Sequence, residues 1–386
     1  MLGKNKKLKR EEDLTALPVK LPCELEEDIL SRLPPLFLAR FRSVCKLWND
    51  LFNENRFIND HFGRARPQFI FLDNSNIYSI EIIGLDGIDP TIELRELASS
   101  GIPYRELELD HTTITTCDGF LFCNFFVSAK GTALWNPWLR QVKWIEYEDK
   151  DFYVFGLGYD NTIPKKFYKI FGYFVRHRQV QRDYHQRVAI YECVSQAFKY
   201  IDTPDEDWPI KEATRGNVSL NGNLYWVTCN PNTHEYFIQS FDFSRDIFKA
   251  FCLPPCRKNR SRDVLFLSVF KGDGFSLLKQ CYVTRSVEIW VTKKKIDTSN
   301  NSGEDIVWIN LMILPTTNLP SLFNKFYGIS YFIYDKTTLI MCCCDDENRA
   351  TCIYIVRGDM FKKIQINSGV FQCCHCVYAP NLIPLL

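Results

Sequence analysis

The sequence lacks the features of a secreted, membrane-bound or nucleic-acid-binding protein. Residues 1–10 are polar and basic and no apolar segment follows them, which argues against a secretory signal peptide. No stretch approaches the ~18 consecutive apolar residues of a membrane span. With 47 basic and 46 acidic residues, the chain has no excess charge that favours nucleic acid or a membrane surface. We therefore expect a protein of the cytoplasm, the nucleus or both, with no nucleic-acid or membrane partner.

Signatures of common enzymes and metal sites are missing as well. The sequence has no G-x-S-x-G, phosphate-binding loop, dinucleotide-binding fingerprint or H-E-x-x-H motif, and its six histidines are scattered. An acidic cluster at residues 205–207 is interpreted as a solvated loop. The chain has 16 cysteines, and the runs at residues 342–344 and 373–376 suggest a zinc site as the alternative to core packing. Neighbouring side chains on a strand point to opposite faces, however, which separates the sulfurs. We predict buried core cysteines, no catalytic residue, no metal and no cofactor.

The pattern of apolar residues divides the chain near residue 65. Before this point apolar residues recur with a helical period, and after it they alternate or form short aromatic runs, as expected of strands. Residues 1–15 are mostly charged and are predicted to be a disordered leader, with a nuclear-localisation signal as the alternative. We place a small helical domain at residues 16–62 and a large β domain at residues 68–386.

Three short helices are predicted in the small domain. Glu24 opens the first, behind a proline and within an acidic turn, which suits a helix start. The proline pair at residues 34–35 ends it, a second helix covers about residues 36–40, and a third carries an apolar stripe over residues 41–52. So small a unit hides few side chains. Its surplus apolar residues either pack on their own helices or on the larger domain, or they form a docking surface for a partner.

Two segments carry a resemblance that decides between these alternatives. The runs LPCELEEDILSRLP at residues 21–34 and FRSVCKLW at residues 41–48 resemble the F-box of plant F-box proteins, and the fixed positions of that pattern are met without a gap. The spacer departs from the family, since Leu36 and Phe37 stand where plant members often have Lys and Ser. This departure removes a candidate N-cap for the second helix.

The resemblance implies a docking role for the small domain. An F-box binds a Skp-family adaptor, which in turn sits on a cullin in an SCF-type ubiquitin ligase. Carried over position by position, the expected adaptor-binding residues are Leu21, Pro22, Leu25, Ile29, Leu30, Leu33, Pro34, Val44 and Trp48. Some of them must serve the domain's own core; we expect Phe41 and Phe52 inside, and the pairs at residues 21–22 and 33–34 outside.

The chain from about residue 68 onward is predicted to be all-β. Short aromatic or β-branched runs, for example at residues 69–72, 119–123 and 287–291, alternate with turn residues. Asn221 and Gly222 lie between two such runs and predict a hairpin with a type I′ turn, because both residues accept positive φ.

An internal repeat of about 50 residues predicts the architecture of the β domain. An aromatic residue, which we expect to open a strand, is followed eight positions later by a lysine at Trp135/Lys143, Tyr191/Lys199, Phe241/Lys249 and Tyr354/Lys362. A copy is missing near Trp290, where residues 293–305 resemble an inserted hydrophilic loop. Such a period is typical of propeller blades, with chance recurrence as the alternative. We predict six blades, the first at residues 69–98, with the lysines exposed on outer strands.

A second resemblance covers about residues 115–380. The motifs FGLGYD (155–160), YKI (168–170), VAIYE (188–192), GNVSLNGNLYW (216–226), SFDF (240–243) and EIWVT (288–292) follow the order of the plant F-box-associated interaction domain of type 1, which is kelch-like. Asn217 is a one-residue insertion, because it stands between Gly216 and Val218 where the family pattern runs directly from Gly to Val.

Together the resemblances imply an α+β multidomain protein, in which a three-helix F-box precedes an all-β, six-bladed propeller. The implied function is that of a non-catalytic substrate-recognition subunit, whose β domain binds a protein target for ubiquitination and proteasomal degradation. The alternative is an F-box protein that binds the adaptor as a scaffold or competitor without a degraded client. A propeller enzyme is a third alternative and would need acidic or metal-binding side chains in its central channel.

Overall fold

The computed structural model describes residues 21–385 with gaps. Outside the described residues lie 1–20, 74–75, 98–111, 126–130, 148–150, 164, 178–183, 203–215, 231, 257–262, 297–302, 315–318, 324–327, 346, 348–349, 367–373 and 386. The predicted leader at residues 1–15 and the acidic cluster at residues 205–207 therefore fall outside the described residues. None of the helices in the described part of the chain has the length and apolar character needed to cross a membrane.

The described residues of the small domain form four helices, one more than the sequence predicts. They are α1 (Cys23–Leu30), α2 (Pro35–Phe41), α3 (Lys46–Leu51) and α4 (Asn55–Arg64). α3 starts later than the predicted third helix because Cys45 is its N-cap, and its Sγ accepts a hydrogen bond from the backbone N–H of Trp48 at 3.5 Å. The prediction missed α4 because that helix buries only Phe57, Ile58 and His61, a stripe too sparse to stand out in the sequence.

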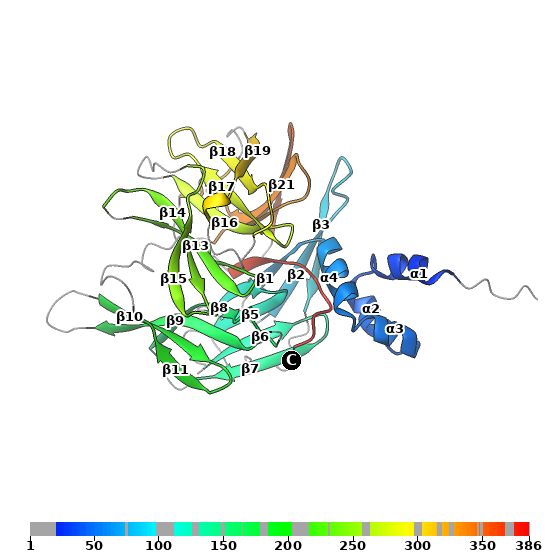
Figure 1. Ribbon diagram of the computed structural model, residues 1–386. Helices are drawn as coiled ribbons and strands as arrows, with labels where there is room; N and C mark the ends of the chain where they lie inside the picture. The colour runs from blue at the N-terminus through cyan, green and yellow to red at the C-terminus, as the bar shows by residue number, and fades with distance from the viewer. Residues whose placement is uncertain are drawn as a thin grey trace, which may run out of the picture.

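The described residues after α4 form six four-stranded antiparallel sheets, the blades of a β-propeller (Figure 1). The predicted blade number is confirmed. From the innermost strand outward, blade 1 consists of β24 (Cys374–Tyr378), β1 (Gln68–Asp73), β2 (Asn76–Ile83) and β3 (Thr91–Glu96), and blade 2 of β4 (Thr112–Cys117), β5 (Phe120–Phe125), β6 (Gly131–Asn136) and β7 (Gln141–Glu146). Blade 3 consists of β8 (Phe152–Tyr159), β9 (Tyr168–His177), β10 (Tyr184–Glu192) and β11 (Ala197–Tyr200), and blade 4 of β12 (Val218–Leu220), β13 (Asn223–Cys229), β14 (Tyr236–Asp242) and β15 (Ile247–Cys252). Blade 5 consists of β16 (Val264–Phe270), β17 (Gly274–Gln280), β18 (Val287–Thr292) and β19 (Trp308–Leu314), and blade 6 of β20 (Ser330–Ile333), β21 (Thr338–Cys344), β22 (Thr351–Arg357) and β23 (Met360–Gln365).

The ring is closed by the C-terminal strand. β24 pairs antiparallel with β1, with Gln68 opposite Tyr378 and Leu72 opposite Cys374. β24 also contacts β4 and β20, the innermost strands of the blades on either side. Blade 1 therefore takes its innermost strand from the far end of the chain, so it extends beyond the predicted first blade at residues 69–98.

The hydrophobic core lies between neighbouring blades. All six residues of β6 and all seven of β21 are buried, because each blade packs both faces against a neighbour. Cys343 packs with Tyr354 between blades 5 and 6, whereas Cys342 packs with Phe69 between blades 6 and 1. Cys376 belongs to the cluster between blades 1 and 2. The prediction that these cysteines are core residues is confirmed, with the sulfurs of Cys342 and Cys343 on opposite faces. Cys373 lies outside the described residues, and Cys23 and Cys45 in the small domain are exposed.

A tight turn links β12 to β13, as predicted. Asn221 and Gly222 have φ values of 51° and 82°, and Leu220 pairs with Asn223, as in a type I′ turn. A Cβ at Gly222 would lie 2.7 Å from the carbonyl oxygen of Tyr159 in blade 3. The Tyr159 N–H donates to the Gly222 carbonyl at 3.0 Å, so this turn also joins blades 3 and 4.

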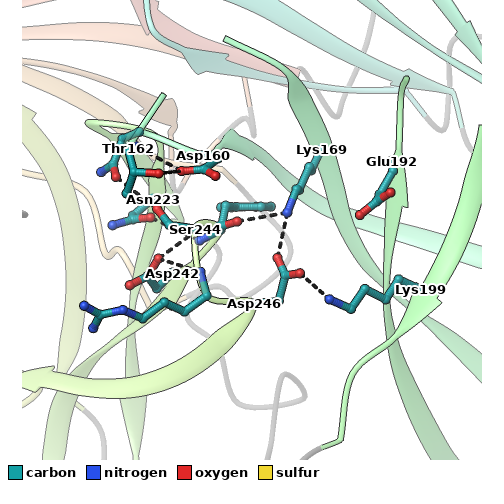
Figure 2. Close-up of polar contacts among 12 residues, drawn as sticks. Asp160, Thr162, Lys169, Glu192, Lys199, Asn223, Asp242, Ser244 and Asp246 are labelled. Atoms are coloured by element: carbon teal, nitrogen blue, oxygen red, sulfur yellow. Dashed lines mark hydrogen bonds and ion pairs between the residues drawn. The ribbon is translucent and has the colours of Figure 1, made fainter. Parts of the chain in front are cut away.

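The repeated lysines lie on outermost strands, and two of them bind the next blade. Lys199 of β11 and Lys169 of β9 both pair with Asp246 in the β14–β15 turn, at 2.6 and 2.9 Å (Figure 2). Lys362 of β23 pairs in the same way with Asp89 of blade 1. Of the four repeated lysines, Lys143 and Lys199 are exposed as predicted, whereas Lys249 and Lys362 are half-buried.

We expected the repeated aromatic residues to open a strand, but three of the four lie near the end of a blade's third strand, and Tyr354 lies in the middle of β22. Trp135, Tyr191 and Phe241 are each the next-to-last residue of β6, β10 and β14, because a short turn fills most of the eight-residue spacing. In blade 5, residues 293–307 separate β18 from β19 and include the short helix η3 (Gly303–Asp305). The predicted insertion is confirmed.

The small domain and the propeller share one apolar cluster. It consists of Leu30, Leu38, Phe52, Phe57 and Ile58 from the helices and Leu382 from the C-terminal segment. Asn381 beside it is fully buried and donates to the Gly119 carbonyl, and its Oδ1 accepts from the Asn136 amide at 3.2 Å. In Figure 1 the C-terminal segment, in red, runs along the side of the propeller that carries the helices. The helices are thereby fixed on the propeller.

Candidate docking surface

Helix α1 presents apolar side chains to solvent. Glu24 and Glu26 lie in its first turn, where carboxylates favour the positive end of the helix dipole. Leu25 and Ile29 are four residues apart and share one face. They are 53% and 52% exposed, and Leu21 before the helix is 51% exposed. About half of each of these side chains is therefore open to solvent in the described structure.

Three more large apolar side chains are exposed on the following segments. Phe37 on α2, Val44 before α3 and Leu47 on α3 are 46%, 61% and 56% exposed. The docking surface, as we name it, consists of Leu21, Leu25, Ile29, Phe37, Val44 and Leu47. Single exposed apolar residues are ordinary, but a concentration of six within residues 21–47 is typical of a protein-binding site. The helices that carry them project from the propeller (Figure 1).

The structure divides the predicted adaptor-binding residues into three groups. The exposed group is Leu21, Pro22, Leu25, Ile29, Pro34 and Val44. Leu33 and Trp48 are half-buried and pack against the helical core, so Leu33 lies further inside than expected. Leu30 is only 3% exposed, because its side chain belongs to the cluster that includes Leu382, so it lies inside the domain and not on its surface.

The interior of the domain agrees with the sequence analysis, but two surface residues were missed. Phe52 is fully buried and Phe41 packs against the same cluster. Phe37 could have been found, since an apolar residue stands where the family often has a polar one. Leu47 falls off the apolar stripe of the third helix, so its side chain had to point away from the core.

Ion pairs hold α1 against α4. Arg64 and Arg32 lie 3.0 and 2.8 Å from the Asp28 carboxylate, and their hydrogen bonds, Arg64 first, lower the pKa of Asp28. Arg56 pairs with Glu27 at 2.6 Å. Because these pairs are solvent-exposed, each contributes little to stability. Their geometric effect is to orient the helix whose other face carries part of the docking surface.

Two further contacts connect the helices. The Trp48 indole N–H donates to a Glu26 carboxylate oxygen, and its ring packs against Phe41 with centroids 5.5 Å apart. His61 of α4 is buried, with Nε2 2.8 Å from the Leu33 carbonyl oxygen. Burial lowers the pKa of His61, so the ring is neutral at pH 7 and its Nε2–H donates this bond. The docking surface is thus supported by a rigid frame.

The innermost strands of the propeller carry no charged side chain. β24, β4, β8, β12, β16 and β20 contain no Asp, Glu, Lys or Arg. His375 of β24 is buried, its Nδ1 lies 2.9 Å from Ser330 Oγ, and burial lowers its pKa to about 4. Within the described residues no three potential metal ligands come together. Among the described residues, these strands bring together neither a pair of carboxylates nor three potential metal ligands.

Comparison with protein families divides the chain at the same place. The F-box domain matches residues 19–60, and the F-box associated beta propeller domain matches residues 68–385. The second match covers more than half of the chain. All six residues of the docking surface fall within the first match.

Curated proteins of Arabidopsis thaliana match over nearly the whole chain. Putative F-box/LRR-repeat protein At3g16555 is 58% identical over 369 residues, which cover 95% of this chain and 99% of the relative. Protein SUPPRESSOR OF NIM1 1 is 57% identical over 369 residues, with coverages of 95% and 98%. Among solved structures, an oligogalacturonate lyase from Vibrio parahaemolyticus matches with a TM-score of 0.38 and 10% identity, over 79% of this chain and 82% of that chain. So distant a likeness has no bearing on function.

Proposed function

We propose that the chain is the substrate-recognition subunit of an SCF-type ubiquitin ligase, because it belongs to the plant F-box proteins that carry an F-box associated β-propeller. In this proposal the F-box docks on a Skp-family adaptor, and through it on a cullin. The propeller binds a protein target for ubiquitination and proteasomal degradation. The observation that carries the proposal is the docking surface, an exposed apolar face on an F-box whose opposite face is buried against the propeller.

We assign adaptor binding to the exposed part of the F-box. The assigned residues are Leu21, Pro22, Leu25, Ile29, Pro34 and Val44, with Phe37 and Leu47 added and Leu30 removed. Leu33 and Trp48 support this surface from the half-buried layer beneath it. In this proposal the F-box domain comprises residues 16–62, and the target-binding domain comprises residues 68–386.

The contribution of the chain to the reaction is proximity and not chemistry. Other subunits would transfer ubiquitin, while this chain holds the target so that its lysines reach the charged conjugating enzyme. Such positioning raises the effective concentration of the reacting groups by many orders of magnitude. The uncharged innermost strands of the propeller support a binding role for this domain.

The test is a pull-down with a purified Skp-family adaptor. We compare the wild-type chain with a Leu25→Asp, Ile29→Asp variant, because both side chains are half exposed and their replacement leaves the core intact. Two charges in a desolvated contact should weaken binding on the order of a thousandfold. Ile88→Asp is the matched control, since Ile88 is 95% exposed on the propeller. Loss of binding in the control, or normal binding by a folded double variant, would contradict the proposal.

The alternative is an adaptor-binding scaffold or competitor without a degraded client. Both functions use the docking surface, so the pull-down cannot separate them. Adding the cullin separates the competitor from the receptor, because a receptor–adaptor pair joins the cullin whereas a competitor keeps the adaptor away from it. We expect the three proteins to co-elute from a size-exclusion column.

A further inference from the structure

The outermost strands of the propeller differ in charge. β3, β7, β11, β15 and β23 each carry at least one charged residue, whereas β19, with the sequence WINLMIL, carries none. Charged side chains on an edge strand oppose its pairing with a further strand. In blades 2, 3 and 4 the repeated lysine stands opposite the residue before the repeated aromatic. That residue is the third from the end of the third strand, and the same position in blade 5 is Trp290, opposite the uncharged Asn310.

The edge of blade 5 is apolar as well as uncharged. β19 is the last strand of its sheet. Val307 just before it is 54% exposed, and Ile309 and Ile313 within it are 42% and 65% exposed. The pairing with β18 skips Leu311, which forms a β-bulge. Because a bulge bends the strand, the straight part open to pairing is residues 307–310.

From this edge we infer a binding mode for the target. We propose that residues 307–310 bind an extended segment of a protein target, which adds a fifth strand to blade 5 and places apolar side chains against Val307 and Ile309. Main-chain hydrogen bonds would give affinity, and the alternate side chains of the added strand would give specificity. The inference rests on the proposed receptor function for its biological role, but the binding itself does not depend on the F-box.

The charges beside this edge define the added strand further. The Lys293 N–H donates from the β18 side to the Val307 carbonyl at 2.9 Å, so the run of lysines at residues 293–295 begins level with the start of the open segment, across β19 from its free edge. Lys295 pairs with Asp273 at 2.5 Å, whereas Lys293 and Lys294 are exposed and have no ion-pair partner among the described residues. An acidic end on the bound segment complements them. Since β19 runs away from these lysines, an antiparallel segment would carry its acids after its apolar residues.

The size of the edge favours a peptide over a second copy of the chain. The seven residues of β19 span about 23 Å. A strip of that length and about 5 Å wide, the spacing between strands, has a far smaller area than the ~800 Å² that each partner contributes to a stable dimer. An extended segment needs no more than a strand and its flanking charges.

The experiment measures fluorescence anisotropy of a labelled peptide with alternating valine and threonine followed by three glutamates. Ile309→Lys restores to blade 5 the charge that other edges carry, and we expect it to weaken peptide binding at least about tenfold. Leu94→Lys is the matched control, because Leu94 is 50% exposed on β3, an edge that is already charged. Lys293→Glu with Lys294→Glu should weaken the same peptide and strengthen a version that ends in lysines.

Absence of binding by the wild-type chain, or equal binding by the Ile309→Lys variant, would overturn the inference. So would sedimentation showing that the wild-type chain dimerises and that Ile309→Lys abolishes the dimer, since the edge would then serve a second copy. Both variants should keep normal adaptor binding in the pull-down. The failure of this inference is therefore distinguishable from failure of the proposed function.

Discussion

Lowering the pH from 7 to 5 should weaken the strand that closes the propeller, because that strand carries a buried histidine. His375 of β24 stands opposite Phe71 of β1, and its Nδ1 lies 2.9 Å from Ser330 Oγ in blade 6. His375 is therefore tied to β1 through its backbone pairing and to blade 6 through its ring. Burial lowers its pKa to about 4, so the folded protein keeps it neutral throughout this pH range.

The magnitude follows from the two pKa values. In the unfolded chain a histidine takes up a proton below about pH 6.5, whereas in the folded chain His375 does so only near pH 4. Between these values the unfolded state binds more protons, so the free energy of unfolding falls as the pH falls. The expected loss from this residue is about 2 kcal/mol between pH 7 and pH 5. Asp28, whose pKa is lowered from 3.8, titrates below this window.

The assay is urea unfolding at pH 7, 6 and 5, followed by tryptophan fluorescence in a reducing buffer. His375→Gln removes the titrating group and should reduce the pH dependence by about 2 kcal/mol, whatever it does to stability at pH 7. Burial also lowers the pKa of His61, so His61→Gln measures the contribution of the F-box separately. A His375→Gln variant that loses as much stability on acidification as the wild type would refute the reasoning.

Two further substitutions test the contacts that join the parts of the molecule. Leu382→Ala should cost about 2–5 kcal/mol, because Leu382 is fully buried in the cluster shared by the F-box and the propeller, and calorimetry should show the F-box unfolding at a lower temperature. A single transition at the wild-type temperature would contradict a shared core. Asp246→Asn should cost about 1–2 kcal/mol, since it leaves the half-buried Lys169 without its ion partner while Asn still accepts the positive φ of 55°. Asp273→Asn is the control for denaturant unfolding, as Asp273 pairs with an exposed lysine and should change stability by less than about 0.5 kcal/mol. Equal effects of the two Asp variants would argue against a role for burial.

The architecture of the propeller was predictable because its blades repeat. The hairpin of β14 and β15 follows the same aromatic-to-lysine spacing as those of blades 2 and 3, and local turn chemistry at Asn221 and Gly222 needs no information from elsewhere in the chain. The closure of the ring was not predictable in the same way. β24 pairs with a strand some 300 residues earlier in the sequence, and no local pattern specifies such a partner.

The docking surface shows where sequence patterns stop. Ile29 and Leu30 are adjacent apolar residues, and the motif marks both, but only one can face the core of so thin a domain. Which one does so depends on α4 and on Leu382 from the other end of the chain. Phe57 of α4 and Leu382 together bury Leu30 and leave Ile29 in solvent. The family motif therefore identifies the domain, while tertiary packing decides which of its residues can touch a partner.

One segment of the chain both closes the propeller and anchors the F-box. Tyr378 of β24 pairs with Gln68 just after α4, and a few residues later Leu382 enters the F-box cluster, where Leu139 of blade 2 also packs. The orientation of the F-box on the ring is therefore determined by two chain segments, the one after α4 and the one after β24, and by the apolar cluster that both domains share. Blade 5 lies three blades from blade 2 in either direction around the six-membered ring. A segment bound at β19 would thus be held at a fixed place remote from the docking surface. This separation leaves room for a folded target beside the adaptor. It also keeps the lysines of the target at a constant distance from the conjugating enzyme.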